Sequence, residues 1–282
     1  MSIQLIADSC CDTTPKIKES LGLLIAPLKI NVGGGKTHVD DGTIDIPSLL
    51  AEMKAAKQAA GSACPSPEEF ARLMRPCDEC VVITLSDKLS GSYNAARVAR
   101  EMVLEEDPAK KIHIFNSKSA AAGELRIALF VRERIDAGDN FETLVLRTEA
   151  YIARQRTLFV LEDLGNLVKN GRLNKVSGIV ASILSLCPIM SDDGQGEVKM
   201  ALKVRGLQNA LSRLVDLVAE QTAPRRKKSV TLVLVYCNCP DRAAKLKKAI
   251  LEKCAAVREV ILVPTGGVST VYANNGGVVL AF

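Results

Sequence analysis

Short apolar runs alternate with longer stretches of helical periodicity along most of the chain. The apolar runs of strand length are residues 3–7, 23–32, 80–85, 111–115, 158–161, 187–190, 197–202, 229–236, 258–263 and 277–282. Apolar residues at three- and four-residue spacing indicate helices at 46–57, 67–75, 92–105, 120–137, 141–154, 205–222 and 241–254. This alternation predicts an α/β protein with a largely parallel sheet in its first half.

The second half of the chain has a different pattern. Its runs 187–190 and 197–202 are separated by the polar residues 191–196, whose two glycines are typical of a hairpin turn. Strands joined by a hairpin are antiparallel, so the second sheet is expected to be mixed. We place the domain boundary near the charged residues 154–156, which predicts an N-terminal α/β domain at 1–155 and a C-terminal α/β domain with a mixed sheet at 156–282.

Composition narrows the class of protein. The chain has 282 residues, 48% of them hydrophobic, which excludes a disordered or fibrous protein. No apolar run approaches the roughly 20 residues that span a bilayer, and the N-terminus begins with a strand-like run and no basic flank. Nine cysteines in a chain of this length, without an export signal, are expected to be reduced thiols. We therefore expect a soluble cytoplasmic protein without a membrane span.

The charge distribution argues against nucleic-acid binding. The net charge is +5, and the densest basic run, residues 225–228, lies between a predicted helix and a predicted strand. Such a run is typical of a solvated connector, and a chain with only 4% aromatic residues offers few platforms for base stacking.

Hydroxyl and glycine residues follow the strands of the first half. The run 3–7 leads into residues 8–15, and the run 80–85 leads into residues 86–92 and then a predicted helix. In open α/β sheets ligands bind beyond the carboxyl ends of the strands, where helix N-termini present free N–H groups. Ser90, Gly91 and Ser92 are therefore candidates for holding an anion, and helix capping is the structural alternative for the two serines.

Ser62 is a third candidate hydroxyl. The nearby Ser66, Pro67 and Glu69 have the spacing of a capping box at a helix start, which accounts for Ser66. Ser62 lies outside that box and has no such structural role.

Several of these segments resemble the ordered motifs of the DegV family. They are residues 8–12, 62–66, 89–96, 169–173 and 276–282, and they occur in the family's order along the whole chain. The resemblance implies two α/β domains with a long-chain fatty acid in a tunnel between them, no enzymatic chemistry and no cofactor. Some members of the family are the acyl-carrying subunit of a bacterial fatty-acid kinase, which makes such a kinase subunit the implied partner.

The resemblance also implies roles for individual residues. Ser62 stands where the family usually has a threonine, and Ser90 is the serine of its SG[TS]Y motif; both would bond the fatty-acid carboxylate. Arg172 matches an arginine that meets the kinase subunit in the family. The chain departs from the family at Tyr272, which occupies the position of the usual histidine; its hydroxyl can still donate to a carboxylate.

Other chemistries find less support in the sequence. Residues 33–37 resemble the end of a phosphate-binding loop, but Ile30 occupies the position of that motif's first glycine. A hairpin turn is therefore expected at residues 33–37. The only histidines are His38 and His113, so a Ser/His/Asp triad is not indicated. The cysteine pairs 77/80 and 237/239 could together offer four thiolates to a zinc ion. The spacing of the second pair is one residue shorter than in a zinc knuckle, so a zinc site is not favoured.

One functional alternative stays open from the residues alone. It is an enzyme or kinase-like subunit that acts on a small hydroxylated or phosphorylated substrate in the interdomain cleft. The abundance of aliphatic residues between 161 and 186 favours an acyl tunnel instead, with Arg172 just outside its apolar wall.

Overall fold

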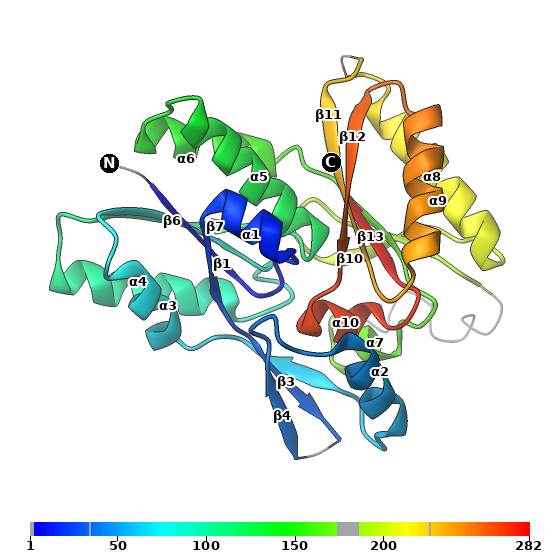
Figure 1. The fold of residues 1–282 in the computed structure, drawn as a ribbon, viewed down its shortest axis with the longest axis horizontal. Helices are drawn as coiled ribbons and strands as arrows, with labels where there is room; N and C mark the ends of the chain where they lie inside the picture. The colour runs from blue at the N-terminus through cyan, green and yellow to red at the C-terminus, as the bar shows by residue number, and fades with distance from the viewer. Residues whose placement is uncertain (1–2, 34, 174–185, 226) are drawn as a thin grey trace.

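The computed structural model describes residues 3–33, 35–173, 186–225 and 227–282 (Figure 1). Its first sheet is parallel, as predicted, with strands in the order β2, β1, β6, β7. These strands are β1 (Gln4–Asp8), β2 (Leu23–Ala26), β6 (Glu79–Thr84) and β7 (Lys111–Asn116). The helices around this sheet are α1 (Pro15–Leu21), α3 (Pro67–Met74), α4 (Ser92–Glu106), α5 (Ala122–Asp136) and α6 (Phe141–Ile152).

Alternate side chains of the parallel sheet point to opposite faces, as the pleat of a strand requires. Ile6 and Val82 pack against α3 and α4, whereas Leu5 and Val81 pack against α5 on the other face. The sheet is therefore buried on both sides, which explains why its strands read as continuous apolar runs.

The second sheet is mixed, as predicted, with the order β10, β9, β8, β13, β11, β12. Its strands are β8 (Thr157–Val160), β9 (Ile189–Asp192), β10 (Val198–Leu202), β11 (Val230–Tyr236), β12 (Val257–Pro264) and β13 (Val278–Ala281). Only β11 and β12 pair in parallel, and β9 and β10 form the expected antiparallel hairpin. Helices α8 (Leu207–Thr222) and α9 (Pro240–Lys253) cover one face.

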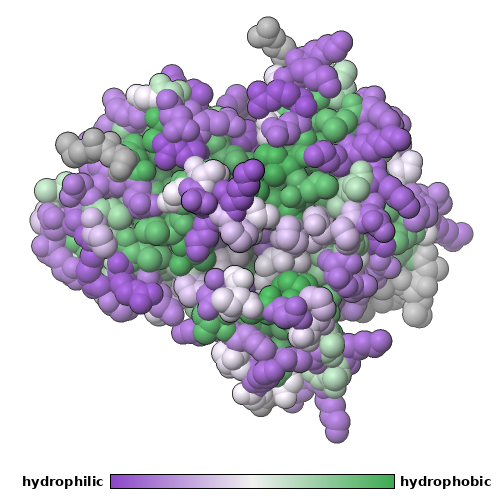
Figure 2. All heavy atoms as spheres, in the orientation of Figure 1, coloured by the Kyte–Doolittle hydropathy of each residue, from purple (hydrophilic) through white to green (hydrophobic). Residues whose placement is uncertain are grey.

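Helix α5 joins the two halves of the molecule. Leu125 and Ala128 of α5 share a core with Leu5 of the first sheet and with Val233 and Val235 of the second. The helix is thus packed between the two sheets, so the halves are held together by apolar burial as well as by polar contacts. On the face seen in Figure 2, hydrophilic residues surround the outline of the molecule and hydrophobic residues lie mainly toward its middle.

A third, small sheet was not predicted. Its strands β4 (Lys36–Val39), β3 (Lys29–Val32) and β5 (Gly61–Ala63) pair antiparallel in that order. The prediction of one strand over 23–32 is wrong, because the chain leaves the parallel sheet after β2, at Pro27, and enters this sheet as β3. The glycine-rich residues between β3 and β4 connect an antiparallel pair, which confirms the hairpin interpretation.

Three further helices lie near the junction of the sheets: α2 (Ile46–Ala55), α7 (Gly165–Lys169) and α10 (Gly267–Ala273). The sequence did not predict α10, whose glycine, serine, threonine and valine residues have low helix propensity. Within the described part of the chain, no helix is both long and apolar enough to cross a membrane.

Candidate functional site

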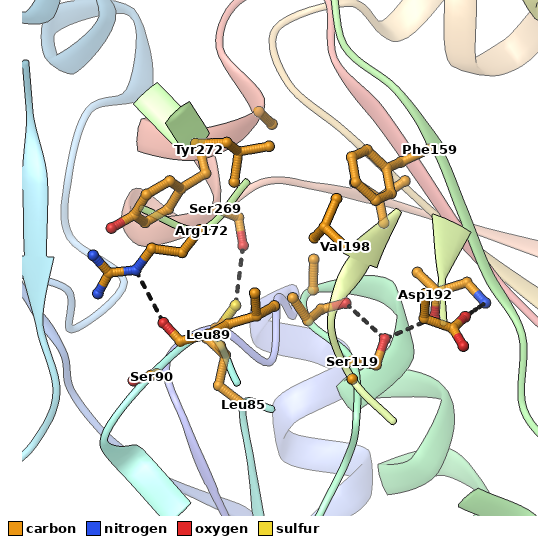
Figure 3. Close-up of a pocket in the computed structure, with 18 of the residues that line it drawn as sticks. Leu85, Leu89, Ser90, Ser119, Phe159, Arg172, Asp192, Val198, Ser269 and Tyr272 are labelled. Carbon is orange, nitrogen blue, oxygen red and sulfur yellow. Dashed lines mark hydrogen bonds between the residues drawn. The ribbon is translucent and has the colours of Figure 1, made fainter. Parts of the chain in front are cut away.

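A pocket lies between the parallel sheet and the mixed sheet (Figure 3). The loops after β1, β6 and β7 contribute Cys10, Leu85 and Ser119, and strands β8 and β10 contribute Phe159 and Val198. The pocket is therefore beyond the carboxyl ends of the parallel strands, where ligands bind in open α/β sheets. Its volume is about 120 Å³, and it is partly open to solvent.

Aliphatic side chains form most of the pocket wall. They are Leu28, Leu85, Leu89, Leu161, Leu167, Val198, Val268 and Val279. Of the aliphatic residues noted in the sequence, Leu161 and Leu167 reach the pocket, whereas Leu164 and Val168 pack in the core beside it. The residues Ile179, Val180, Ile183 and Leu184 lie outside the described part of the chain. A pocket with this lining favours burial of hydrocarbon.

Ser62 and Tyr272 meet at one end of the pocket. The Ser62 Oγ on β5 lies 3.0 Å from the Tyr272 hydroxyl on α10, and both residues line the pocket. The hydrogen bond joins the two halves of the chain across 210 positions of sequence. The structure thus brings together two of the candidates that the sequence placed far apart.

Of the candidates at 90–92, Ser90 reaches the described pocket lining and the other two do not. Ser90 lines the pocket, and its Oγ accepts a hydrogen bond from the Ser92 backbone N–H at 3.2 Å. The Ser92 side chain is fully buried, with its Oγ 3.1 Å from the Ser90 Oγ. Neither Gly91 nor Ser92 is among the described residues that line the pocket. Ser90 therefore lines the pocket and accepts from the first backbone N–H of α4, but the N-cap of this helix is Gly91 and no side chain caps it, so the capping alternative does not account for Ser90 or Ser92.

Arg172 lies in the pocket wall, not outside it as the sequence suggested. Its Nε donates to the Leu89 carbonyl at 3.0 Å, and its Nη1 donates to the Asn170 carbonyl at 2.6 Å. In Figure 3 its guanidinium lies on the same side of the pocket as Tyr272 and Ser90. We call this group of Ser62, Ser90, Arg172 and Tyr272 the hydroxyl–arginine end; it offers hydrogen-bond donors and one positive charge to an anion.

Two buried carboxyl groups fix the helix that carries Tyr272. Asp40 accepts hydrogen bonds from the backbone N–H groups of Gly267 and Val268, both at 2.9 Å, and Asp12 accepts one from Gly266 at 2.7 Å. Burial raises the pKa of Asp12 to about 8, and it raises the pKa of Asp40 as well. Both acids come from the first half of the chain, so they hold the first turn of α10 against it.

The groups nearest the pocket are poorly suited to covalent catalysis. Burial raises the pKa of the Cys10 thiol well above its usual value, helped by the nearby Glu124 carboxyl, so the thiol stays protonated. Both histidines are elsewhere, His38 bonded to Glu52 and His113 bonded to Glu149. This arrangement can hold a ligand, and it places no activated nucleophile at the described lining.

The two cysteine pairs considered for zinc are far apart in the fold. Cys80 is buried in the core of the parallel sheet with α3 and α4, where Cys77 packs against it, whereas Cys237 and Cys239 belong to the cores of the mixed sheet. In the described ranges, no group of three or more histidine, cysteine or acidic side chains is placed to hold a metal ion.

The opposite end of the pocket is also polar, which the sequence analysis did not anticipate. Ser119 follows β7, Thr157 begins β8 and Asp192 ends β9, and all three line the pocket. The signal for Ser119 was present, because residues 116–119 follow a strand of the parallel sheet in the same way as the two loops that were considered. Thr157 and Asp192 had no comparable signal, since only the pairing of β8 with β9 brings them to this place.

Comparison with known proteins places the chain in a family. A family model described as an uncharacterised protein of the DegV family matches residues 2–282. A DegV domain-containing protein of Streptococcus pyogenes is 32% identical over 288 residues, covering 100% of this chain and 99% of the relative.

Two solved structures share the fold over their whole length. A DegV-family protein from Ruminococcus gnavus, refined with vaccenic acid, has a TM-score of 0.94 and 37% identity, with 100% of both chains covered. The Streptococcus pneumoniae Fatty Acid Kinase (Fak) B3 protein, loaded with linoleic acid, has a TM-score of 0.90 and 30% identity, with 100% of this chain and 99% of that chain covered. By its sequence and its fold, this chain belongs to the DegV family.

Proposed function

We propose that this protein binds a long-chain fatty acid in the pocket, with the carboxylate at the hydroxyl–arginine end. The observation that carries the proposal is the combination of a continuous aliphatic wall with hydroxyls and a guanidinium gathered at one end. The acyl chain would be buried among Leu85, Leu161 and Leu167, and the carboxylate would accept hydrogen bonds from Ser62, Ser90 and Tyr272. The fatty acids in the two structural relatives support this assignment.

Burial of the chain supplies most of the binding free energy in this proposal. Each buried methylene contributes about 0.8 kcal/mol, so a palmitoyl chain supplies on the order of 10 kcal/mol before ordering costs. The pocket volume of about 120 Å³ is small for such a chain. The lining leucines would have to change rotamer to admit it, as unbranched and γ-branched side chains on loops can do.

The first experiment is to identify what the purified protein carries. Native mass spectrometry before and after organic extraction should show a mass increment of one fatty acid per chain, because a ligand held by this much buried surface dissociates slowly. A refolded, delipidated sample should recover one equivalent of added palmitic acid. An extract that contains only polar metabolites, together with no uptake of palmitic acid, would contradict the proposal.

The proposed role of the bound acid is to be presented to a kinase subunit, without chemistry by this chain. The similarity to the Fak B3 protein supports such a partner, and the described lining holds neither an activated thiol nor an imidazole. All nine cysteines are free thiols, which fits a role in the cytoplasm.

A direct assay separates this role from an enzymatic one. Incubation of the loaded protein with ATP alone should form no acyl phosphate, and addition of the cognate kinase subunit should form it. Turnover of ATP or of a small phosphorylated substrate by the isolated protein would favour the enzymatic alternative instead.

A further inference from the structure

The end of the pocket opposite the hydroxyl–arginine end is built from polar side chains that a plain hydrocarbon tail does not use. The Ser119 Oγ lies 2.7 Å from the Thr157 Oγ1, and the Thr157 backbone N–H donates to Asp192 Oδ2 at 2.9 Å. In Figure 3 Ser119 and Asp192 lie on the opposite side of the view from Arg172 and Ser90, with Val198 between them. The aliphatic part of the pocket thus separates two polar ends.

A second, small cavity adjoins this polar end. It has a volume of about 10 Å³ and shares Lys118, Ser119, Thr157 and Asp192 with the wall of the main pocket. A cavity of this size holds about one water molecule or one hydroxyl group.

Gln155 provides an independent indication that this cavity takes a ligand group. The side chain is 6% exposed and lines the small cavity, and its Oε1 has no hydrogen-bond partner among the described residues. A buried amide oxygen without a partner costs about as much as a lost hydrogen bond, so such groups are rare unless something else satisfies them. A donor placed in the small cavity would satisfy it.

The position of these groups is fixed by the fold. Ser119 is bonded through its backbone, with its carbonyl accepting from the Ser86 N–H at 2.9 Å. Ser86 Oγ in turn donates to the Gly196 carbonyl at 2.8 Å, which holds the β9–β10 hairpin against the loop after β6. A Cβ at Gly196 would lie 2.3 Å from Ser86 Oγ, so the close approach needs a glycine. The polar end is therefore preorganised by contacts between both halves of the chain.

We infer that Ser119, Gln155, Thr157 and Asp192 form a second subsite, which binds a hydroxyl group carried by the acyl chain far from its carboxylate. The inference rests on the proposed fatty-acid binding and names the class of ligand more narrowly. A hydroxyl is favoured over a second carboxylate because Asp192 and the Gln155 Oε1 are acceptors, and Glu197 adds another negative charge to the lining. Lys118 and Arg156 also line this end; Lys118 is partly exposed and Arg156 is exposed, with its Nη1 donating to the Gln155 carbonyl, so solvent screens both charges.

The expected effect of a terminal hydroxyl on affinity differs from that in a tunnel with an apolar end. In a tunnel with an apolar end, burying an unpaired hydroxyl weakens binding roughly ten- to a hundredfold. In this pocket a terminal hydroxyl should find partners, so the ω-hydroxy acid should bind within about threefold of the plain acid or more tightly.

The test is a comparison of matched ligands by displacement of a fluorescent fatty acid from the delipidated protein. The ligands are myristic, palmitic and stearic acids, their ω-hydroxy derivatives and the dicarboxylic acids of the same lengths. For at least one length, the ω-hydroxy acid should bind as tightly as the plain acid, and the dicarboxylic acid should bind at least tenfold more weakly than the ω-hydroxy acid because of its repulsion from Asp192.

Isosteric variants assign the effect to the subsite. Thr157→Val and Gln155→Leu should each weaken the ω-hydroxy acid about tenfold relative to the plain acid of the same length. The matched control is Thr148→Val, because Thr148 is another buried threonine, whose Oγ1 has no partner among the described residues, and it lies on α6 outside the described pocket lining. This control should leave the ratio of the two affinities unchanged.

Three outcomes would contradict different steps of the inference. If every ω-hydroxy acid binds the wild type at least tenfold more weakly than its plain counterpart, the subsite does not exist. If the ratio is near one but neither Thr157→Val nor Gln155→Leu alters it, the hydroxyl lies elsewhere and the assignment is wrong. If no acid of any series binds, the proposed fatty-acid binding itself fails.

Discussion

The two ends of the pocket use similar hydroxyl pairs in opposite electrostatic surroundings. At the hydroxyl–arginine end, Ser62 and Tyr272 lie 3.0 Å apart beside the Arg172 guanidinium. At the far end, Ser119 and Thr157 lie 2.7 Å apart beside the carboxylate of Asp192. In both cases the pair joins the first half of the chain to the second. Under the proposed function, the neighbouring charge, and not the hydroxyls themselves, is expected to decide which end receives the anionic group of a ligand.

The largest effect is expected from removing both pocket hydroxyls of the first half at the hydroxyl–arginine end. A hydrogen bond to a charged acceptor contributes roughly 1.5–3 kcal/mol, so Ser62→Ala or Ser90→Ala alone should weaken palmitic acid about tenfold, and the double variant about a hundredfold. Displacement of a fluorescent fatty acid measures the affinities.

Ser66→Ala is the matched control for these variants. Like Ser90, Ser66 accepts a backbone N–H at the start of a helix, but it is exposed and lies outside the described pocket lining. It should lower stability slightly and leave affinity unchanged. A double variant at Ser62 and Ser90 that binds as tightly as wild type would mean that these serines serve the fold alone.

Removal of the guanidinium tests the electrostatic part of the comparison. Arg172→Ala should weaken palmitic acid about tenfold and leave hexadecanol within about twofold, because only the acid carries a charge. Arg75→Ala, which breaks ion pairs with Glu68 and Glu106 on α3 and α4, should change neither affinity.

The same variant also tests the partner role of Arg172. At saturating palmitic acid, a lower rate of kinase-dependent acyl-phosphate formation would show that the guanidinium contributes to docking as well as to ligand binding. Equal losses of affinity for the acid and for the alcohol would show instead that Arg172 shapes the wall through its bonds to Leu89 and Asn170.

A separate effect, on stability and not on affinity, is expected from the pH dependence of the α10 anchor; at about 1.4 kcal/mol per pH unit it reaches up to about 4 kcal/mol between about pH 5 and 8. The pKa of Asp12 is raised to about 8 in the fold from an ordinary value near 4, so between these values the folded state holds a proton that the unfolded state has lost. Wild type should therefore lose stability relative to Asp12→Asn as the pH rises from about 5 to 8. Urea unfolding at several pH values measures this difference.

Asp45→Asn is the control for this titration. Asp45 caps α2 from the surface, and its hydrogen bonds to Ser48 lower its pKa, so its titration falls below this pH window. The difference between this variant and wild type should be constant from about pH 5 to 8. A constant difference for Asp12→Asn as well would place Asp12 in the ionised state throughout.

The smallest effects are expected at Tyr272. Tyr272→Phe removes the hydroxyl that pairs with Ser62 and should weaken palmitic acid about threefold to tenfold, since one donor is lost. Tyr272→His should stay within about threefold of wild type, because an imidazole N–H can replace the hydroxyl as donor. The same displacement assay measures both. A histidine variant that binds no better than the phenylalanine variant would show that the tyrosine ring places its donor where imidazole cannot reach.

The sequence alone determined most of the secondary structure and named candidate residues that line one end of the pocket. The parallel strands β1, β6 and β7 are buried on both faces, so their apolar runs were unambiguous, and the β9–β10 hairpin followed from its polar turn. Ser62 and Ser90 became candidates because hydroxyls next to strand ends and helix starts have a local signature, and Tyr272 became one through the family resemblance alone; the structure places all three at the pocket. These features depend on residues close together in the chain.

Only the tertiary structure decided the rest. Helix α10 has no amphipathic pattern and is held by Asp12 and Asp40, more than two hundred positions away in sequence. Arg172 reaches the pocket because its guanidinium bonds Leu89 from the other half of the chain. The far polar end likewise exists only where Ser119 meets Thr157 and β8 pairs with β9. Contacts between distant residues leave no periodic trace in a single sequence, because each partner alone is an ordinary loop or strand residue.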